Sequence, residues 1–256
     1  MLLARVMPCL LLKNKGLVKT VQFKNPTYIG DPINAVWIFN KKDADELVFL
    51  DIDATPQKRG PDIETIGKIA DEAFMPVAAG GGIRNLDDIK ALFNAGVEKV
   101  VINTQAVLNP SIIKDAAQIY GSQSIVASMD VKKTLMGKYE IFTHGGIKKS
   151  GKDPVAQAKS YEQLGAGEIF LNSIDRDGMM QGLDIPLIRS VADAITIPLI
   201  ACGGAGTLGH ISQAIKDGHA SAIAAGSLFV YQGPRKGVLV NFPARPDLDK
   251  TLGAAQ

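Results

Sequence analysis

Two glycine pairs stand 122 residues apart in closely similar surroundings and could bind phosphate. The first lies in Val77-Ala-Ala-Gly-Gly-Gly-Ile-Arg84 and the second in Leu199-Ile-Ala-Cys-Gly-Gly-Ala-Gly206. Each pair follows a strand-like run and precedes a helix-like segment, where backbone N–H groups can approach an anion and the helix dipole favours negative charge. A tight turn would explain one pair alone. Two symmetric pairs, each followed one strand later by Asn103-Thr104 or Ala225-Gly226-Ser227, indicate two anion sites.

The sites predicted from this pattern consist of Gly81, Gly82, Asn103 and Thr104 in one half of the chain and Gly203, Gly204, Ala225 and Gly226 in the other. The expected ligand is a phosphorylated small molecule. It carries two phosphates, or a diphosphate and a second anionic group.

Carboxylates at strand ends are the candidates for acid–base chemistry. Asp130 ends the fifth predicted strand and is the expected catalytic residue, since a carboxylate there can act as a general acid or base. Asp51, at the end of the second strand, suits catalysis and a structural hydrogen bond to a loop equally well. Ser173 and Asp177, at and after the end of the sixth strand, are expected to bind substrate. Lys19 could reach over the site or be a solvated loop lysine.

Four further charges, Arg5, Glu46, Lys99 and Glu168, lie at or near the starts of predicted strands. They should therefore converge at the end opposite to the carboxylates. Two acids and two bases can neutralise one another, so the cluster is either a salt-bridged plug or a gate into the interior.

Short apolar runs alternate with amphipathic segments, which is the βαβ pattern of a parallel sheet. The predicted strands are Ala4–Leu10, Glu46–Asp51, Val77–Ala79, Lys99–Ile102, Ser124–Met129, Glu168–Leu171, Leu199–Ala201 and Ala222–Ala224. The predicted helices are Pro32–Asp43, Asp62–Glu72, Leu86–Ala95, Ser111–Tyr120, Pro154–Leu164, Ile185–Ala194 and Leu208–Lys216.

The offset of 122 residues also relates Gly96 to Gly218, Glu46 to Glu168 and Asp31-Pro32 to Asp153-Pro154. Eight strands with this internal repeat favour an α/β (β/α)8 barrel, or TIM barrel, over an open sheet. We expect one domain over residues 1–256, with half-barrels at about 1–122 and 123–256. After residue 230 the last element should be short or irregular, because Pro243 and Pro246 disfavour a regular helix.

Composition narrows the functional class. The 256 residues carry a net charge of +2 without a Lys/Arg-rich run, which argues against a nucleic-acid binder. No apolar stretch reaches the length of a membrane span, and the opening residues suit a strand better than an export signal. Cys9 and Cys202 imply no disulfide framework, so a reducing cytoplasm is expected. His144, His210 and His219 lack metal-ligand spacing, although His144 could face the barrel mouth; we expect no metal and no cofactor.

The repeat assigns a partner position to Asp130. Leu10-Leu-Leu-Lys13 aligns with Met129-Asp-Val-Lys132 at an offset of 119, so Leu11 is symmetric to Asp130. An acid–base pair divided between the halves cannot operate here in its symmetric form.

These motifs resemble the cyclase subunit of imidazole glycerol phosphate synthase over about residues 1–230. The resemblance rests on Arg5…Pro8-Cys-Leu10, Gly30-Asp-Pro32, Ala44-Asp-Glu-Leu-Val-Phe-Leu-Asp51, Gly80-Gly-Gly-Ile-Arg84, Thr143-His-Gly-Gly146, Asp175-Arg-Asp-Gly178 and Gly203-Gly-Ala-Gly206. It implies a barrel that docks a glutaminase subunit at its floor. Ammonia would pass a gate matched by Arg5, Glu46, Lys99 and Glu168 and reach a bis-phosphorylated substrate.

The departures from this family lie at the chemistry. Leu11 replaces one of two catalytic aspartates, and Asp130 matches the other. Asn172 and Met179 replace threonines, Gly226 stands where a serine would help to hold phosphate, and the final helix is missing. The pattern suggests a paralogue. Some relatives help to convert a nucleotide-linked amino sugar to an acetamidino derivative for surface polysaccharides, and we expect this role. The alternatives are the histidine-pathway cyclase itself and a non-catalytic scaffold that activates a glutaminase.

Overall fold

Eight parallel strands close into a barrel in the computed structural model, which describes residues 4–134 and 136–253. Around the barrel the strands follow the order β10-β11-β12-β1-β4-β5-β6-β7, and pairing of β7 with β10 closes it. Their bounds are β1 Arg5–Lys13, β4 Leu47–Asp51, β5 Val77–Gly80, β6 Lys99–Ile102, β7 Ile125–Lys133, β10 Glu168–Ser173, β11 Leu199–Cys202 and β12 Ala222–Ala225. The (β/α)8 barrel predicted from the sequence is confirmed. The expected domain limits, residues 1 and 256, lie outside the described residues.

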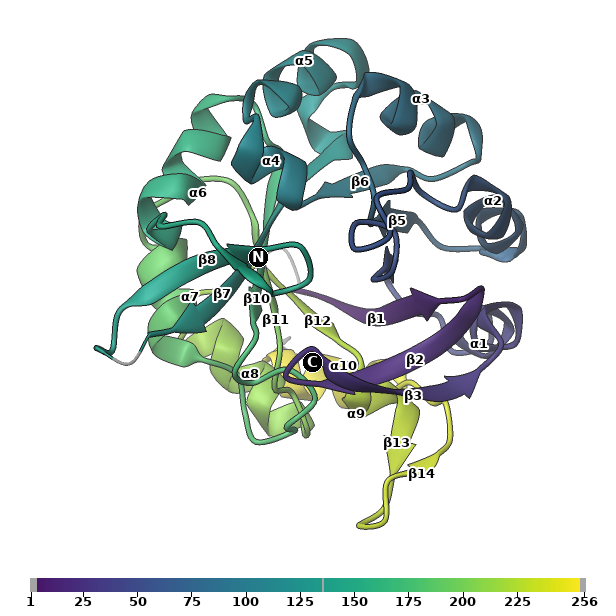
Figure 1. Ribbon diagram of the computed structural model, residues 1–256. Coiled ribbons are helices and arrows are strands. Elements are labelled where there is room, and N and C mark those ends of the chain that lie inside the picture. Colours follow the sequence, from purple (N-terminus) through teal and green to yellow (C-terminus); the bar gives the residue numbers. More distant parts are fainter. Residues whose placement is uncertain (1–3, 135, 254–256) are drawn as a thin grey trace.

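The predicted helices form a ring around the strands (Figure 1). Their bounds are α1 Pro32–Asn40, α2 Ile63–Glu72, α3 Leu86–Asn94, α5 Ser111–Tyr120, α6 Pro154–Gln163, α7 Ile185–Ala192 and α8 Leu208–Lys216. The larger apolar cluster lies between strands and helices and includes Phe39, Ile89 and Tyr161. A smaller cluster fills the barrel itself with residues such as Val48, Phe170 and Ile200. The strands are therefore apolar on both faces, as parallel strands under helices require.

Helix caps repeat with the same offset as the sequence motifs. Asp31 caps α1 and Asp153 caps α6, and in each helix a proline follows in the first turn. Proline suits that position because its fixed φ matches the helix and no N–H is needed there. Asp62 and Asp184 cap α2 and α7, and Asn85 and Thr207 cap α3 and α8. These three helices of one half thus begin with a side-chain cap at the same position as their counterparts in the other half.

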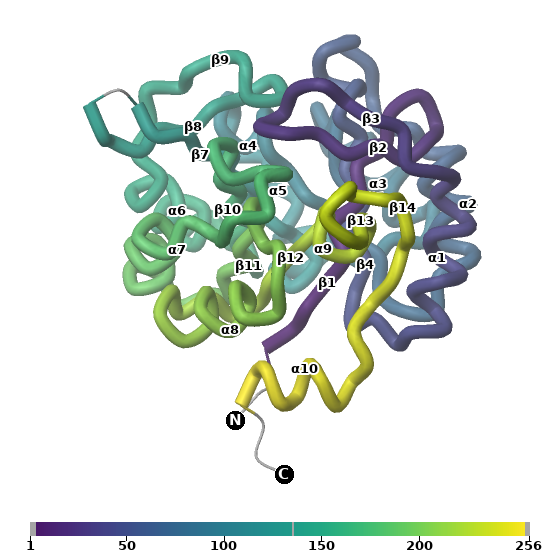
Figure 2. Tube along the Cα trace, turned by 90° about the horizontal axis from the view of Figure 1, so that it is seen from below, coloured from purple at the N-terminus to yellow at the C-terminus, as the bar shows by residue number. Residues whose placement is uncertain are grey.

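Two hairpins extend the barrel at the carboxyl ends of its strands. β1 continues into β2 (Gly16–Val21) and β3 (Lys24–Gly30), whereas β7 continues into β8 (Tyr139–Thr143) and β9 (Lys148–Lys149). Seen from the side, both hairpins lie at one end of the barrel, which we call the mouth (Figure 2). The sequence analysis did not predict these strands, the short helix α4 (Thr104–Leu108) or the 3-10 turn η1 (Ser122–Ser124).

The C-terminal segment differs from the expectation in one respect. After the single turn α9 (Ser227–Val230) come a small hairpin, β13 (Tyr231–Gln232) and β14 (Gly237–Val238), and a helix, α10 (Arg245–Leu252). The segment is short and irregular up to residue 244, as predicted. The expectation that Pro246 would prevent a regular helix was wrong, because Pro246 lies in the first turn of α10. α10 packs on α8 at the end opposite to the mouth, the floor (Figure 2).

Phe242 attaches this segment to the barrel. It is 2% exposed, and its ring centroid lies 4.9 Å from that of Phe229 and 6.3 Å from that of Phe39 on α1. The segment thus covers the wall between α8 and α1, where a regular eighth helix would otherwise lie.

We expect Phe242→Ala to lower the free energy of unfolding by about 3–5 kcal/mol, the usual cost of a buried phenylalanine deletion. Leu239→Ala, in the same segment but 57% exposed, is the control and should cost far less. Urea denaturation of both variants measures the difference. Equal stabilities would show that the segment contributes little to the barrel.

Candidate active site

A pocket of about 320 Å³ opens at the mouth. The predicted site residues that line it are Lys19, Gly81, Gly82, Asn103, Thr104, Asp130, Asp177, Gly203, Gly204, Ala225 and Gly226. Ser173 is not among the lining residues: it is buried, and its backbone carbonyl accepts the N–H of Asp177. Because side chains alternate along a strand, the preceding residue, Asn172, lines the pocket instead. The structure thus gathers the candidate residues, with Ser173 as the exception.

Asp130 lies on the wall formed by β7 and β10. It is in direct register with Asn172, and both residues line the pocket. Burial raises the pKa of Asp130 to about 7, and the nearby Asp177 carboxylate acts in the same direction. The side-chain amides of Asn172 and Asn103 act in the opposite direction by stabilising the charged form. A carboxyl with such a pKa can both accept and donate a proton near neutral pH.

Strand register places Leu11 where the repeat predicted it. Leu11 pairs with Leu50 between β1 and β4, as Asp130 pairs with Asn172 between β7 and β10. Both leucines line the pocket and are half-buried. At equivalent heights, one wall therefore offers two isobutyl groups and the other a carboxyl and an amide.

The glycine pairs have a structural role that is independent of any ligand. Gly81 has φ +99° and Gly203 has φ +93°, values that favour glycine. A Cβ atom at either position would collide with a carbonyl oxygen, that of Asp51 in the first half and that of Ser173 in the second. The tight-turn explanation thus holds at both sites. The same turns bring the glycines to the pocket wall, so anion binding there stays a proposal.

Lys19 points into the pocket from β2. It is only 5% exposed, and its Nζ donates to the backbone carbonyl of Cys9 over 3.5 Å. A Cβ atom at Gly226 would occupy the position of this ammonium group. Glycine at position 226 therefore leaves room for the Lys19 ammonium where the structure places it. A buried ammonium with one long hydrogen bond is well suited to an anionic ligand.

Asp177 connects the first hairpin to the site. Its Oδ2 accepts from Thr20 Oγ1 at 2.9 Å, and its carbonyl accepts the N–H of Gln22 at 2.9 Å. Burial raises the pKa of Asp177, while the Lys19 ammonium opposes this. These contacts hold β2 over the turn at 175–178 and keep Lys19 above the pocket.

His144 and Phe23 complete the upper rim, and both line the pocket. His144 lies at the turn between β8 and β9, where its N–H donates to Thr104 Oγ1 at 3.1 Å. Burial and the neighbouring Lys148 lower its pKa, so the ring is neutral at physiological pH. Phe23, at the tip of the first hairpin, packs near Gly146 of the second. The sequence analysis did not select Phe23, since loop contacts between distant hairpins leave no periodic signal.

Asp51 is a structural carboxylate. Arg59 binds it through two nitrogens at 2.7 and 3.0 Å, and the N–H groups of Asp53 and Ala54 donate to its Oδ1. Of the two interpretations offered for Asp51, the structure supports the loop hydrogen bond.

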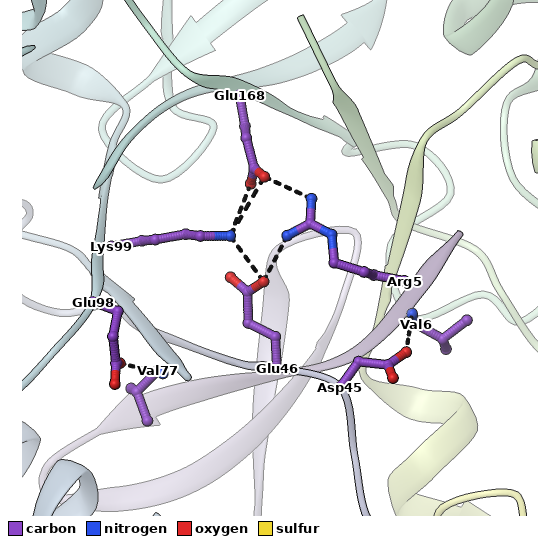
Figure 3. Close-up of polar contacts among 8 residues, drawn as sticks. All are labelled: Arg5, Val6, Asp45, Glu46, Val77, Glu98, Lys99 and Glu168. Carbon is purple, nitrogen blue, oxygen red and sulfur yellow. Dashed lines mark hydrogen bonds and ion pairs between the residues drawn. The ribbon is translucent and has the colours of Figure 1, made fainter. Parts of the chain in front are cut away.

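At the floor, the four charged residues form a closed ring (Figure 3). Arg5 bonds Glu46 at 2.7 Å and Glu168 at 2.6 Å, and Lys99 bonds the same two carboxylates at 2.9 and 3.4 Å. Both glutamates are buried, whereas Arg5 is 30% exposed at its side chain. The carboxylates raise the pKa of Arg5 against the effect of its burial. The predicted convergence of these charges is confirmed.

The remaining candidate residues are two histidines and two cysteines, of which only the cysteines line the pocket. His210 accepts the N–H of Gly206, and His219 pairs with Asp193 at 2.6 Å. Cys9 and Cys202 are free, buried and part of the pocket wall. Over residues 4–134 and 136–253, three or more His, Cys, Asp or Glu side chains nowhere gather as metal ligands would. Within the same residues, no helix is both long and apolar enough to cross a membrane.

Comparison with known proteins matches residues 5–234 to the family described as "Histidine biosynthesis protein". The "Putative imidazole glycerol phosphate synthase subunit hisF2" of Pseudomonas aeruginosa is 47% identical over 245 residues, which are 96% of this chain and 98% of the relative. A similarly named HisF subunit of Leptospira interrogans is 46% identical over 248 residues, 96% and 98% of the two chains. The corresponding hisF3 subunit of Vibrio vulnificus is 45% identical over 253 residues, 98% and 97% of the two chains. With its barrel and these matches, the chain belongs to the histidine biosynthesis protein family, among relatives named as imidazole glycerol phosphate synthase subunits.

Proposed function

We propose that this chain is the ammonia-using synthase subunit of a glutamine amidotransferase complex in the cytoplasm. Its substrate would be a nucleotide-linked sugar that it aminates or amidinates for surface-polysaccharide biosynthesis. The observation that carries the proposal is the pair of equivalent positions at the mouth, with Asp130 on one wall and Leu11 on the other. Leucine cannot carry a proton, so two-sided acid–base catalysis is lost while the rest of the pocket persists.

The floor of the barrel supports an ammonia route. Between the charged ring and the pocket the interior is filled by small or apolar residues, including Ala78, Val101 and Ile200, and an ammonia route would be lined by them. Neutral ammonia can pass such a lining more readily than ammonium, because an unpaired charge in an apolar interior is strongly disfavoured. A glutaminase docked at the floor would deliver ammonia at the ring formed by Arg5, Glu46, Lys99 and Glu168.

At the mouth, the two glycine turns with Asn103, Thr104, Ala225 and Gly226 would hold the anionic groups of the substrate, and Lys19 would contribute a positive charge. Asp130 would then take a proton from the attacking nitrogen or return one to the leaving oxygen. Its pKa of about 7 suits both tasks at neutral pH.

The names of the relatives favour a second candidate, the histidine-pathway cyclase itself. Under that proposal, Asp130 alone would suffice for cyclisation. The chain would then restore growth without histidine to a strain that lacks its own cyclase. A scaffold that only activates a glutaminase would instead stimulate glutamine hydrolysis without consuming a phosphorylated substrate.

The first test supplies the chain with the bis-phosphorylated substrate of the histidine pathway and ammonium salt, which bypasses the glutaminase. We expect imidazole glycerol phosphate to form at least about 10²-fold more slowly than with a two-aspartate cyclase, because an acid–base residue contributes roughly 10²–10⁴ in rate. Leu11→Asp should restore part of the activity, and Leu11→Asn is the matched variant that cannot carry a proton. An ordinary rate with the unmodified chain would refute the proposal in favour of the histidine-pathway cyclase.

A second test asks whether the charged ring at the floor acts as a gate for ammonia or only as a salt-bridged plug. Arg5→Ala opens the ring, and we expect it to change glutamine-driven turnover of the complex while ammonium-driven turnover stays the same, since the pocket lies at the other end. Arg245→Ala removes a more exposed floor ion pair, with Asp45 at 2.7 Å, and is the control. Equal losses of both rates in Arg5→Ala would mean that the ring only stabilises the barrel.

A third test reads the pKa of Asp130 from stability. The folded protein holds the Asp130 proton up to about pH 7, whereas the unfolded chain releases it near the ordinary value of 3.8. In this window the folded state binds more protons, so stability falls as pH rises. Asp130→Asn removes this loss. Its melting temperature should therefore rise relative to that of the unmodified protein between about pH 4 and pH 7 and keep a constant difference above pH 7, and parallel curves over that window would contradict the raised pKa.

A further inference from the structure

The order of strands around the barrel divides the pocket into four walls. β5 and β6 carry the first anion wall, with Gly81, Gly82, Asn103 and Thr104, and β11 and β12 carry the second, with Gly203, Gly204, Ala225 and Gly226. The strands β1 and β4 lie between them on one side, and β7 and β10 on the other. A ligand that spans both anion walls must therefore turn one edge to β1 and β4 and the opposite edge to β7 and β10.

The wall of β1 and β4 is apolar where it meets the pocket. Leu11 and Leu50 are direct register partners, line the pocket and are each partly exposed to it. Lys19 reaches this side from β2 and donates to the carbonyl of Cys9 on β1, whereas the other charged groups nearby are engaged with one another. Lys13 pairs with Asp53 at 2.7 Å, and Arg59 binds Asp51 through two nitrogens. Lys13, Asp51 and Asp53 also line the pocket, but each is already paired, so the two isobutyl groups are what the two strands leave for a ligand.

The two opposed walls would favour different ligand edges. A hydroxyl or amino group placed against Leu11 and Leu50 would lose its hydrogen bonds to water without replacement, which is unfavourable. A methyl group there would instead remove apolar surface from water on both sides. On the opposite wall, Asp130 and Asn172 would accept or donate hydrogen bonds and so favour a polar edge with exchangeable protons.

From this opposition we infer that Leu11 and Leu50 select a sugar that carries a methyl-bearing substituent, such as an acetamido group, on the edge away from Asp130. The inference rests on the proposed function, in which the ligand is a nucleotide-linked sugar. It deepens that function, since it makes Leu11 a specificity-determining residue and not simply the site of a lost aspartate. The reacting nitrogen would approach the edge that faces Asp130.

The test uses UDP-N-acetylglucosamine and UDP-glucose, which differ in an acetamido group against a hydroxyl, as probes in calorimetric titration. The unmodified chain should bind the acetamido sugar at least about 10-fold more tightly, within the roughly 10- to 200-fold that one methylene is worth in an apolar pocket. Leu11→Ala should reduce this preference to within about threefold, and Leu11→Asp should abolish it. Leu11→Met keeps an apolar side chain of similar size and should retain it.

Melting temperatures of the three variants establish that each is folded, and Leu50→Ala repeats the measurement from the partner strand. Equal binding of the two probes to the unmodified chain, or a preference that Leu11→Ala leaves intact, would overturn the inference. Sugar amination with a glutaminase, measured separately, would in that case still support the proposed function. If neither probe binds at all, both the inference and the nucleotide-sugar role are refuted.

Discussion

Closure of the barrel is the constraint on which the site depends. β7 pairs with β10 over six residues, from Glu168 opposite Val126 to Ser173 opposite Val131, and β1 joins β12 and β4. Because all eight strands are parallel, closure brings every strand start to the floor and every strand end to the mouth. The charged ring and the pocket therefore follow from one topological fact, and neither could form in an open sheet.

Each end of the barrel handles its buried charge differently. At the floor, two acids and two bases neutralise one another within hydrogen-bond distance, which offsets the cost of removing them from water. At the mouth, the buried groups are left less well matched. In the part of the chain that the structure describes, the groups that act on Asp130 are Asp177, Asn172 and Asn103, none of them cationic, and Lys19 donates to a carbonyl over a long 3.5 Å. The floor is arranged for stability in the absence of ligand, and the mouth leaves its strong donors and acceptors for one.

Much of this arrangement is readable from the sequence, because it follows from short-range chemistry repeated at a fixed offset. Helix caps such as Asp31 and Asp153, the glycine turns and the apolar strands each leave a local pattern. The hairpins at the mouth do not, since they are held by contacts with residues far away in the sequence, such as that of Thr20 with Asp177. The choice of Ser173 over Asn172 has another cause. Successive side chains at the end of a strand point alternately toward the pocket and away from it, so an error of one residue selects the wrong side. The prediction that Pro246 disfavours a helix was wrong because a proline that would break the interior of a helix is well accommodated in its first turn.

The repeat also explains how one substitution can redirect a pocket without disturbing its frame. Leu11 and Asp130 occupy equivalent positions, but the backbone that holds them is fixed by strand pairing and by helices whose caps lie elsewhere. A change at position 11 therefore alters the chemistry of one wall alone. Gly226 lies at the end of the neighbouring strand β12, and the absence of a side chain there leaves room for the Lys19 ammonium. Asp130, the glycine turns and the floor ring are held by other contacts, so positions 11 and 226 determine only what a ligand would meet on the wall that β1 shares with its neighbours. Under the proposed function, divergence within this barrel changes which substrate is held before it changes how nitrogen is delivered.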